Sequence, residues 1–529
     1  MTATATAPHP AIRSVQTDVI RILSTPGSHF DVIQEGPFAT VSRVWTTIED
    51  GVPQWIVVKS ATTLRKFSRE PHDIVKELRL LSSMLHPNIV FTMGSFRDDE
   101  QNLLSIYMPY FPISLSSILA SPYFSPHPFP PSTNVPEEHA SQLCQDQFLT
   151  IAKGIMIQTL DALAFLHDAP RRIGHRDIKP ENIMLTKEGC VKLIDFGVSW
   201  KENEAEVEKT EDLWPEYKGK LYFEVSTRAY RAPELLFGTR HYDQCAIDLW
   251  SVGATFAEFF TALRLESGDD DDDDEDEDEE DEEREREQDE DTRLAPFIVP
   301  RYLRIGYPGA QWKRDTLFNG ERGEIGLAWS IFKIFGTPTE ENWPGFEELP
   351  GATSVVFNVV ESVPLAPLFP NLPPSRRSEQ CDLEPTSSPS SSSVTSTTSS
   401  TSPSSLILDL ISSFLVYPSA NRIRAEDAMR HPFFTESASS SSPASSPATS
   451  TPATTTASST SSQSCPSATQ TNAKRKPPSR SAILLPPGYA LEKGSPALRE
   501  HVVYEWEGKS LGEWLDVVLV SGEGGAEGR

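Results

Sequence analysis

The chain has 529 residues, and only 38% of them are hydrophobic because long Ser/Thr/Pro and acidic stretches dilute regions that could form a core. The formal net charge of -29 argues against nucleic acid as a direct partner, and residues 269–291 carry much of it, with 20 acidic residues against two arginines, a net of -18. The five cysteines include no CxxC pair, and no run of about 18 apolar residues occurs, so we expect a reducing compartment and no membrane contact.

The first part of the chain has a sequence pattern typical of a β-sheet. Residues 1–28 form a lead-in containing Ala, Thr and Pro that we expect to be disordered, and residues 30–59 then alternate apolar and polar positions around turn signals, which is typical of antiparallel strands. Residues 73–85 repeat apolar positions at helical spacing, and His86-Pro87 closes that helix.

The later part of the chain is mainly helical, which predicts an α+β fold with two lobes. Residues 147–167 carry an apolar stripe typical of a core helix. Further helices are expected at 245–262, 326–335, 406–415 and 425–431.

Biased segments interrupt and follow the folded part, and they lack the apolar area needed to form a core. We expect disordered insertions at 267–293 (acidic) and 384–405 (Ser/Thr-rich), and a disordered Ser/Thr/Pro tail at 435–480. Residues 481–529 regain hydrophobic character, so we expect this C-terminal extension to dock back on the folded body.

Three motifs stand in a fixed order: HRDIKPEN at 175–182, LIDFG ending at Gly197, and APE at 232–234. By these motifs the chain resembles the protein kinases from about residue 30 to residue 434. The resemblance implies a bilobal fold, with an N-lobe of a small antiparallel sheet and one helix (about 29–110) and a mainly helical C-lobe (about 111–434). It also implies transfer of the γ-phosphate of ATP to a serine or threonine hydroxyl of a protein substrate, with Mg²⁺ as cofactor.

The resemblance assigns the chemistry to six residues. Asp177 should orient the substrate hydroxyl and accept its proton, and Lys179, a residue typical of Ser/Thr kinases, should neutralise the transferring phosphoryl group. Asn182 and Asp195 should bind Mg²⁺ through hard oxygen atoms. Lys59, in QWIVVKS, should hold the α- and β-phosphates with Glu77 as its ion-pair partner. Any one of these residues alone could form a surface salt bridge or a turn, and only the set carries the assignment.

The same resemblance outlines an adenine pocket. Ile33 and Val41 should form its roof, Met184 its floor, and Met108 its gatekeeper, with the hinge at 109–111 ending on Phe111. The loop that covers the phosphates departs from the family pattern, since Gly36 is the one glycine left and Gln34 and Ala39 stand at the other two positions. This departure bears on nucleotide affinity and loop mobility more than on chemistry.

Asp248 in DLWSVG and the pair Glu234 with Arg422 match family positions that brace the catalytic and activation loops. Downstream segments such as EVSTRAYRAPELLFGTRHYDQ and FLVYPSANRIRAEDAMRHPFF look like the cyclin-dependent kinase (CMGC) group. The helix that should carry a cyclin-contacting segment reads SREPHDIVKEL instead, so no cyclin site is evident.

The activation loop also departs from this group. Where many relatives carry a threonine that is phosphorylated and held by three arginines, this chain has Tyr222, and the arginine positions hold Arg176, Lys76 and Trp200. The arginines that would hold a phosphate and the threonine that would carry it are therefore depleted together. The pattern resembles the single-subunit CDK-activating kinases of fungi, and it leads to the hypothesis of a monomeric kinase that is active without activation-loop phosphorylation and acts on other cyclin-dependent kinases.

Two alternatives stay open. Another CMGC kinase could act on the RNA polymerase II tail or on proline-directed sites, and a pseudokinase scaffold could recruit partners through its biased segments. The intact set of Lys59, Asp177, Asn182 and Asp195 disfavours the scaffold. The short basic cluster at 474–476 favours the nucleus over the cytoplasm, although such clusters are common by chance.

Overall fold

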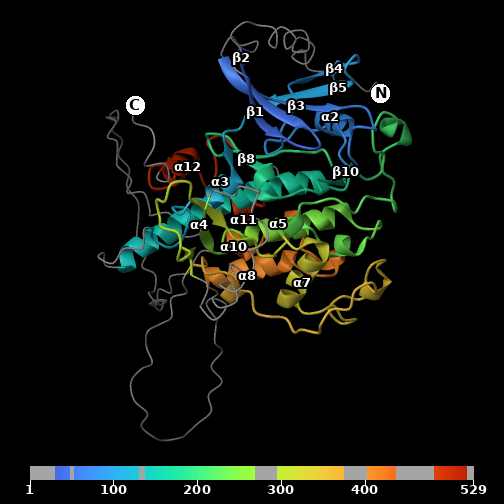
Figure 1. Ribbon diagram of the computed structural model, residues 1–529. Helices are drawn as coiled ribbons and strands as arrows, with labels where there is room; N and C mark the ends of the chain where they lie inside the picture. The colour runs from blue at the N-terminus through green and yellow to red at the C-terminus, as the bar shows by residue number, and fades with distance from the viewer. Residues whose placement is uncertain are drawn as a thin grey trace, which may run out of the picture.

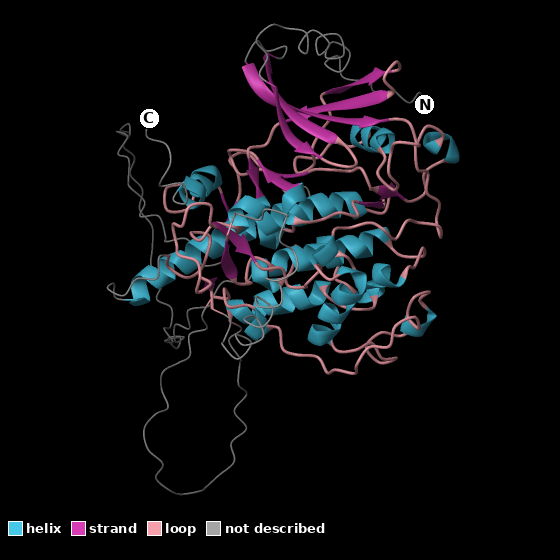
Figure 2. Ribbon diagram, in the orientation of Figure 1, coloured by secondary structure: helices cyan, strands magenta, loops and turns pink. Residues whose placement is uncertain are grey.

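The computed structural model describes residues 30–47, 53–129, 137–267, 295–373, 402–435, 482–491 and 493–520. The described chain forms two lobes, a sheet-rich N-lobe above a mainly helical C-lobe (Figures 1 and 2). The bilobal α+β prediction is therefore confirmed. The expected lead-in at 1–28, the acidic run and nearly all of the Ser/Thr/Pro tail lie outside the described residues.

The N-lobe is built on a five-stranded antiparallel sheet in the order β1-β2-β3-β5-β4. Its strands are β1 (Phe30–Glu35), β2 (Thr40–Thr47), β3 (Pro53–Thr62), β4 (Gly94–Asp98) and β5 (Leu103–Pro109). β3 lies in the middle and pairs Lys59 with Val41 on β2 and with Ile106 on β5. The register therefore places the lysine in the centre of the sheet.

Helix α2 (Ile74–Ser82) lies beside this sheet (Figure 1). It begins where Asp73 accepts hydrogen bonds from the backbone N–H groups of Val75 and Lys76, an N-cap that satisfies two of the free donors of the first turn. The predicted helix at 73–85 is too long at its C-terminal end. The N–H groups of Ser83 and Met84 bond to carbonyls three residues back, so the chain tightens out of the α-helix there.

The C-lobe contains most of the helices. They are α3 (Leu115–Leu119), α4 (Glu137–His167), α5 (Gln244–Ala257), α7 (Gly323–Phe335), α8 (Pro403–Phe414), α9 (Ala425–Ala428) and α10 (Pro432–Thr435). The part of α4 from Gln142 to His167 is long and apolar enough to cross a membrane, yet its most apolar window is wholly buried inside the protein. α4 is thus the core helix of this lobe, as its apolar stripe predicted, although it begins at Glu137 and not at the expected residue 147.

Two further expected boundaries, those of α8 and α5, are wrong for local reasons. α8 begins at Pro403, inside the segment expected to be disordered, because Ser402 caps the N–H of Ser405 and proline suits the first helical turn. α5 ends at Ala257 rather than near residue 262, because the N–H groups of Phe259 and Phe260 bond to carbonyls three residues back.

Short strands connect the helices in small two- and three-stranded sheets. These strands are β6 (Ile113–Ser114), β7 (Ile173–Gly174), β8 (Ile183–Leu185), β9 (Val191–Leu193), β10 (Trp200–Lys201), β11 (Leu263–Glu266), β12 (Phe297–Ile298), β13 (Gln311–Arg314), β14 (Ile483–Leu484) and β15 (Val502–Val503).

The C-terminal extension lies against the C-lobe. Its helices α11 (Pro496–Arg499) and α12 (Leu511–Val520) pack near α10, α3 and α4 (Figure 1). Leu484 and Leu511 are completely buried, and a Cβ atom at Gly154 of α4 would collide with the carbonyl of Leu484. The extension thus contributes to the same hydrophobic core as α4.

Candidate active site

The site begins with one lysine that contacts two carboxylates. The Nζ atom of Lys59 lies 2.7 Å from Oε2 of Glu77 and 2.7 Å from Oδ1 of Asp195. These residues come from β3, from α2 and from the loop after β9, so the contact joins the two lobes. It requires α2 to lie close to the sheet.

The three charges shift one another's pKa values. Burial alone would lower the pKa of Lys59, but Asp195 and Glu77 raise it above its ordinary value. Burial alone would raise the pKa of Asp195, but the Lys59 ammonium holds it well below its usual range. Burial raises the pKa of Glu77, and Lys59 offsets part of that rise. At neutral pH the lysine and Asp195 are charged.

A second group of polar side chains surrounds Asp177 in the loop after β7. Asn182 donates through Nδ2 to Oδ2 of Asp177 at 2.9 Å, and Lys179 lies 3.1 Å from the same oxygen. Thr227 donates to Oδ1 of Asp177 at 2.8 Å and accepts from Lys179 at 2.7 Å. The structure therefore brings Asp177, Lys179 and Asn182 together as the motif spacing implies, and adds Thr227.

Other side chains of the C-lobe hold the loops that carry these residues in place. Asp248 on α5 accepts the backbone N–H groups of His175 and Arg176, each at 2.7 Å. Glu234 and the buried Arg422 form a bidentate pair at 2.7 and 2.8 Å, the geometry that planar guanidinium and carboxylate groups favour. Both contacts were expected from the sequence.

The residues named for an adenine pocket differ in burial. Met108 and Phe111 are buried, and Val41 and Met184 are half-buried. Ile33 is 50% exposed and lies where the β1–β2 register shifts. The structure thus places Ile33 at an open edge.

The loop between β1 and β2 turns tightly, with the N–H of Gly36 bonded to the carbonyl of Ala39. Its tip is anchored by aromatic stacking, since the rings of Phe38 and His72 lie 3.6 Å apart at 24°. Arg69 adds a cation–π contact with Phe38. The stacked side chain of Phe38 thus restrains a loop that has one glycine where the family pattern has three.

Residues 30–434 match the family model described as "Protein kinase domain". The chain belongs to the protein kinase family. This match covers the two lobes and both groups of side chains described above.

Among its relatives the kinase is 27% identical over 283 residues to "Cyclin-dependent kinase 20" of Danio rerio, covering 53% of this chain and 54% of that one. It is 26% identical over 366 residues to "Serine/threonine-protein kinase ssn3" of Neosartorya fischeri, covering 68% of this chain and 65% of the relative. The chain thus spans less than two thirds of either relative. These names support a serine/threonine kinase of the cyclin-dependent type within the CMGC group.

A chain in the "Crystal Structure of the yeast RNA Pol II CTD kinase CTDK-1 complex" aligns with 20% identity and a TM-score of 0.44, covering 77% of this kinase and 93% of that chain.

Protein kinases use ATP with Mg²⁺, and the donor atoms here fit such an ion. Asn182 uses its amide nitrogen on Asp177, which leaves its oxygen for a cation. Asp195 accepts from Lys59 through Oδ1, which leaves Oδ2. Its backbone φ of 64° is left-handed, an uncommon conformation that is often found at functional sites. Amide and carboxylate oxygens are ligands that Mg²⁺ prefers.

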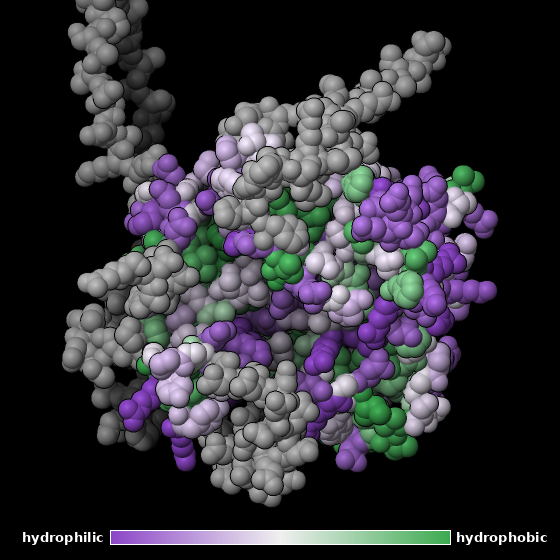
Figure 3. All heavy atoms as spheres, turned by 45° about the horizontal axis from the view of Figure 1, so that its top comes forward, coloured by the Kyte–Doolittle hydropathy of each residue, from purple (hydrophilic) through white to green (hydrophobic). Residues whose placement is uncertain are grey.

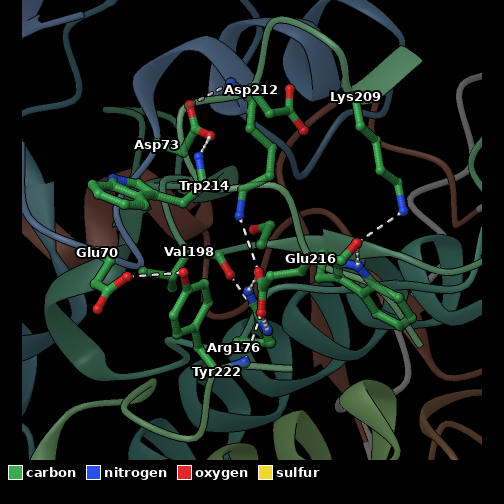
Figure 4. Close-up of polar contacts among 12 residues, drawn as sticks. Glu70, Asp73, Arg176, Val198, Lys209, Asp212, Trp214, Glu216 and Tyr222 are labelled. Carbon is green, nitrogen blue, oxygen red and sulfur yellow. Dashed lines mark hydrogen bonds and ion pairs between the residues drawn. The ribbon is translucent and has the colours of Figure 1, made fainter. Parts of the chain in front are cut away.

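The sequence interpretation missed Glu216. In the structure its carboxylate contacts both Arg176 and Lys76, the two basic residues expected to have lost their phosphate (Figure 4). The expectation that the arginines and the phosphate are depleted together stays a prediction, and the structure adds a carboxylate that contacts the two basic residues that remain. Tyr222, at the usual phosphothreonine position, donates its hydroxyl to Glu70 at 2.9 Å.

Proposed function

We propose that this chain is a protein kinase that transfers the γ-phosphate of ATP to a serine or threonine hydroxyl, and that its substrates are the activation-loop threonines of cyclin-dependent kinases. The observation that carries the proposed kinase activity is the assembled contact of Lys59 with both Glu77 and Asp195. A binding scaffold has no physical need for this contact together with the Asp177 group.

Each charged group has a chemical role in the proposed reaction. Lys59 binds the α- and β-phosphates, and Glu77 orients it. Asp177 accepts the proton of the substrate hydroxyl, while Lys179, 3.1 Å from it, stabilises negative charge on the transferring group. Asn182 and Asp195 would hold Mg²⁺, which neutralises phosphate charge when bound. Positioning and charge supply most of the catalysis.

The substrate class is supported by Tyr222, which stands where many relatives carry a phosphorylated threonine, and by the contacts of the side chains around that position. A kinase whose own activation loop needs no phosphate can act upstream of kinases that do. The expectation of a monomer stays a prediction. No cyclin site is evident in the sequence, and the names of the relatives are a reason to test a cyclin directly.

A second candidate function is phosphorylation of proline-directed sites or of the RNA polymerase II tail. Ser226 supports it, because its left-handed backbone (φ 65°) lies next to Thr227, which contacts Asp177. We expect a fixed backbone of this kind to contact the substrate residue that follows the phosphoacceptor and so to select it. Selectivity at that substrate position separates the two candidates.

The test is a phosphotransfer assay with Mg-ATP that compares the wild-type chain with Asp177→Ala. Four substrates are offered: a catalytically dead cyclin-dependent kinase alone, the same protein bound to its cyclin, a peptide of the RNA polymerase II tail, and a generic serine peptide. Aspartate-dependent labelling of the activation-loop threonine supports the proposal. Labelling of the RNA polymerase II tail peptide without the activation-loop threonine moves the assignment to the second candidate. Labelling of the generic peptide alone keeps the kinase activity and discards both substrate assignments. If turnover is absent, including after a cyclin is added to the kinase, the proposed activity is wrong.

A further inference from the structure

Glu216 is a buried acidic residue at the meeting point of three parts of the kinase. Its carboxylate lies 2.5 Å and 2.8 Å from the guanidinium nitrogens of Arg176 in the catalytic loop, and 3.3 Å from Nζ of Lys76 on α2. Figure 4 shows the side chain pointing between these elements. One carboxylate thus connects the catalytic loop, the activation segment (residues 195–234) and the N-lobe helix.

Burial makes these contacts energetically important. Arg176 is 0% exposed, Glu216 is 2% exposed and Lys76 is 3% exposed. A buried charge is costly unless it is paired, so removal of the carboxylate would leave two cations close together in a low-dielectric environment. The arginine also donates to the carbonyl of Val198 at 2.6 Å and to the hydroxyl of Tyr242 at 3.0 Å, but these neutral acceptors cannot replace the charge of the carboxylate.

The backbone around Glu216 is held on several sides. Its carbonyl accepts from Nε1 of Trp200 at 3.4 Å and from Nζ of Lys209 at 3.1 Å, and its Oε1 accepts the N–H of Tyr222 at 2.9 Å. The tryptophan therefore occupies the third basic position and contacts the same residue, although it carries no charge. The glutamate is placed by at least three contacts besides its ion pairs.

Other residues of the activation segment contact α2 along its length. Arg79 pairs with Asp212 at 2.8 Å and also with Glu204, and Asp73 accepts the backbone N–H of Trp214 at 2.9 Å. Lys76 lies between these contacts and precedes Glu77, the partner of Lys59. The segment that carries Glu216 therefore holds the helix that positions the active-site lysine.

The size of the anion matches the cations that remain. A phosphate carries about -1.5 to -2 charges and three acceptor oxygens, which suits three arginines. A carboxylate carries one charge and two oxygens, and here it meets one arginine and one lysine. A smaller, singly charged anion needs fewer cations than a phosphate, and one arginine with one lysine is what contacts it here.

We propose that Glu216 is a built-in positioning residue that takes the place of an activation-loop phosphate, so that the kinase adopts its active arrangement without modification. The inference rests on the proposed kinase function and adds how that function is regulated. The ion pairs with Arg176 and Lys76 orient the catalytic loop and α2 in every copy of the protein. Activity is then set by synthesis and substrate, without an activating kinase upstream.

The experiment compares wild type, Glu216→Gln, Glu216→Asp and Glu202→Gln after phosphatase treatment, with mass spectrometry to show that each protein is free of phosphate. Glu202 is a matched control because it is an acidic residue of the same segment that pairs with Arg172 and Lys218 instead. Phosphatase treatment should leave wild-type kcat unchanged. Glu216→Gln should lower kcat about 10-fold or more, because it removes the charge from a buried pair, Glu216→Asp should retain more activity than Glu216→Gln, and Glu202→Gln should match wild type.

Hydrogen exchange supplies a readout that does not depend on turnover. Glu216→Gln should speed amide exchange in 74–82 and in 198–227 while exchange in α4 stays at the wild-type rate. A protein without turnover would contradict the proposed function, and this exchange pattern would still decide the role of Glu216. The proposal is overturned if Glu216→Gln leaves both kcat and exchange unchanged. It is also overturned if phosphatase treatment abolishes wild-type activity together with phosphate on Tyr222 or Ser226.

Discussion

Glu77 and Lys59 form an ion pair across the N-lobe, and the carboxylate is 1% exposed while the lysine is 13% exposed. Glu77 also accepts the backbone N–H of Phe196, the residue after Asp195, at 3.3 Å. The glutamate therefore links Lys59, which we propose binds the phosphates, to the backbone beside Asp195, which we propose binds Mg²⁺, as well as supplying a counter-charge.

Neutralising this residue should reduce catalysis more than stability. Glu77→Gln keeps the shape of the side chain but loses the charge that orients Lys59, and we expect kcat to fall about 10²-fold because misplacing a positioned group costs this much. The measurement is kcat at saturating ATP. Asp31→Asn is a control because its pair with Arg43 is exposed, and exposed pairs contribute little. Equal rates for Glu77→Gln and wild type would contradict the assigned role.

Much of this active site could be predicted because its residues lie in short, contiguous motifs. Asp177, Lys179 and Asn182 fall within six residues, and Asp195 follows at a characteristic distance. Glu216 could not be found in the same way. Its partners lie 40 and 140 residues away, and residues 202–216 contain several other acidic side chains at similar spacing. The depleted arginine positions suggested that a phosphate was absent, but only the folded chain shows which carboxylate replaces it.

The ends of the elements were also hard to predict. Helix ends depend on caps and on tight final turns, such as the Ser402 cap of α8 and the turns after α2 and α5, which apolar periodicity does not report. Lobe order was easier, because strand-like and helix-like periodicities separate along the chain. The face of the molecule drawn in Figure 3 mixes hydrophilic residues with smaller hydrophobic patches.

The phosphate-covering loop should depend on Phe38. An aromatic stack contributes about 0.5–1.5 kcal/mol, so Phe38→Ala should raise KM for ATP about 2- to 10-fold with a smaller change in kcat. Steady-state kinetics at varied ATP concentration measure this effect. Phe67→Ala is a suitable control, since Phe67 is 67% exposed and lies outside the loop. An unchanged or lower KM would show that the stack does not order the loop for nucleotide.

Stability should fall in mild acid because two histidines are held neutral. Burial lowers the pKa of His86 to about 4, with Lys192 and Arg171 lowering it further, and burial lowers the pKa of His72 to about 4 as well. The ordinary value in an unfolded chain is about 6.5. Between about pH 4 and pH 6.5 the unfolded state therefore binds more protons, so the free energy of unfolding is highest above that window and decreases as the pH falls through it.

Urea unfolding at several pH values tests this assignment. The wild-type midpoint should fall between about pH 6.5 and pH 4. His86→Asn keeps an acceptor for the N–H of Asn88 but removes the titrating ring, so its midpoint should vary less with pH. An identical pH dependence in the two proteins would exclude His86 as a source of the acid sensitivity.

The C-terminal extension should stabilise the C-lobe through Tyr489. This side chain is 7% exposed, and its hydroxyl lies 2.8 Å from Oδ2 of the fully buried Asp161 on α4 and also contacts Asn88. Tyr489→Phe removes this donor from a buried carboxylate, so we expect a loss of about 1–3 kcal/mol in the free energy of unfolding. Denaturant titration measures the loss.

Tyr504→Phe provides the comparison for Tyr489→Phe. Tyr504 also belongs to the extension, but it is 44% exposed and its hydroxyl donates to the carbonyl of Tyr489 at 3.0 Å. Water can replace that bond, so the variant should lose less than about 1 kcal/mol. Equal effects of the two substitutions would mean that the hydroxyl at 489 contributes no more than an exposed one. The extension would then owe its attachment to its apolar contacts, chiefly those of Leu484 and Leu511.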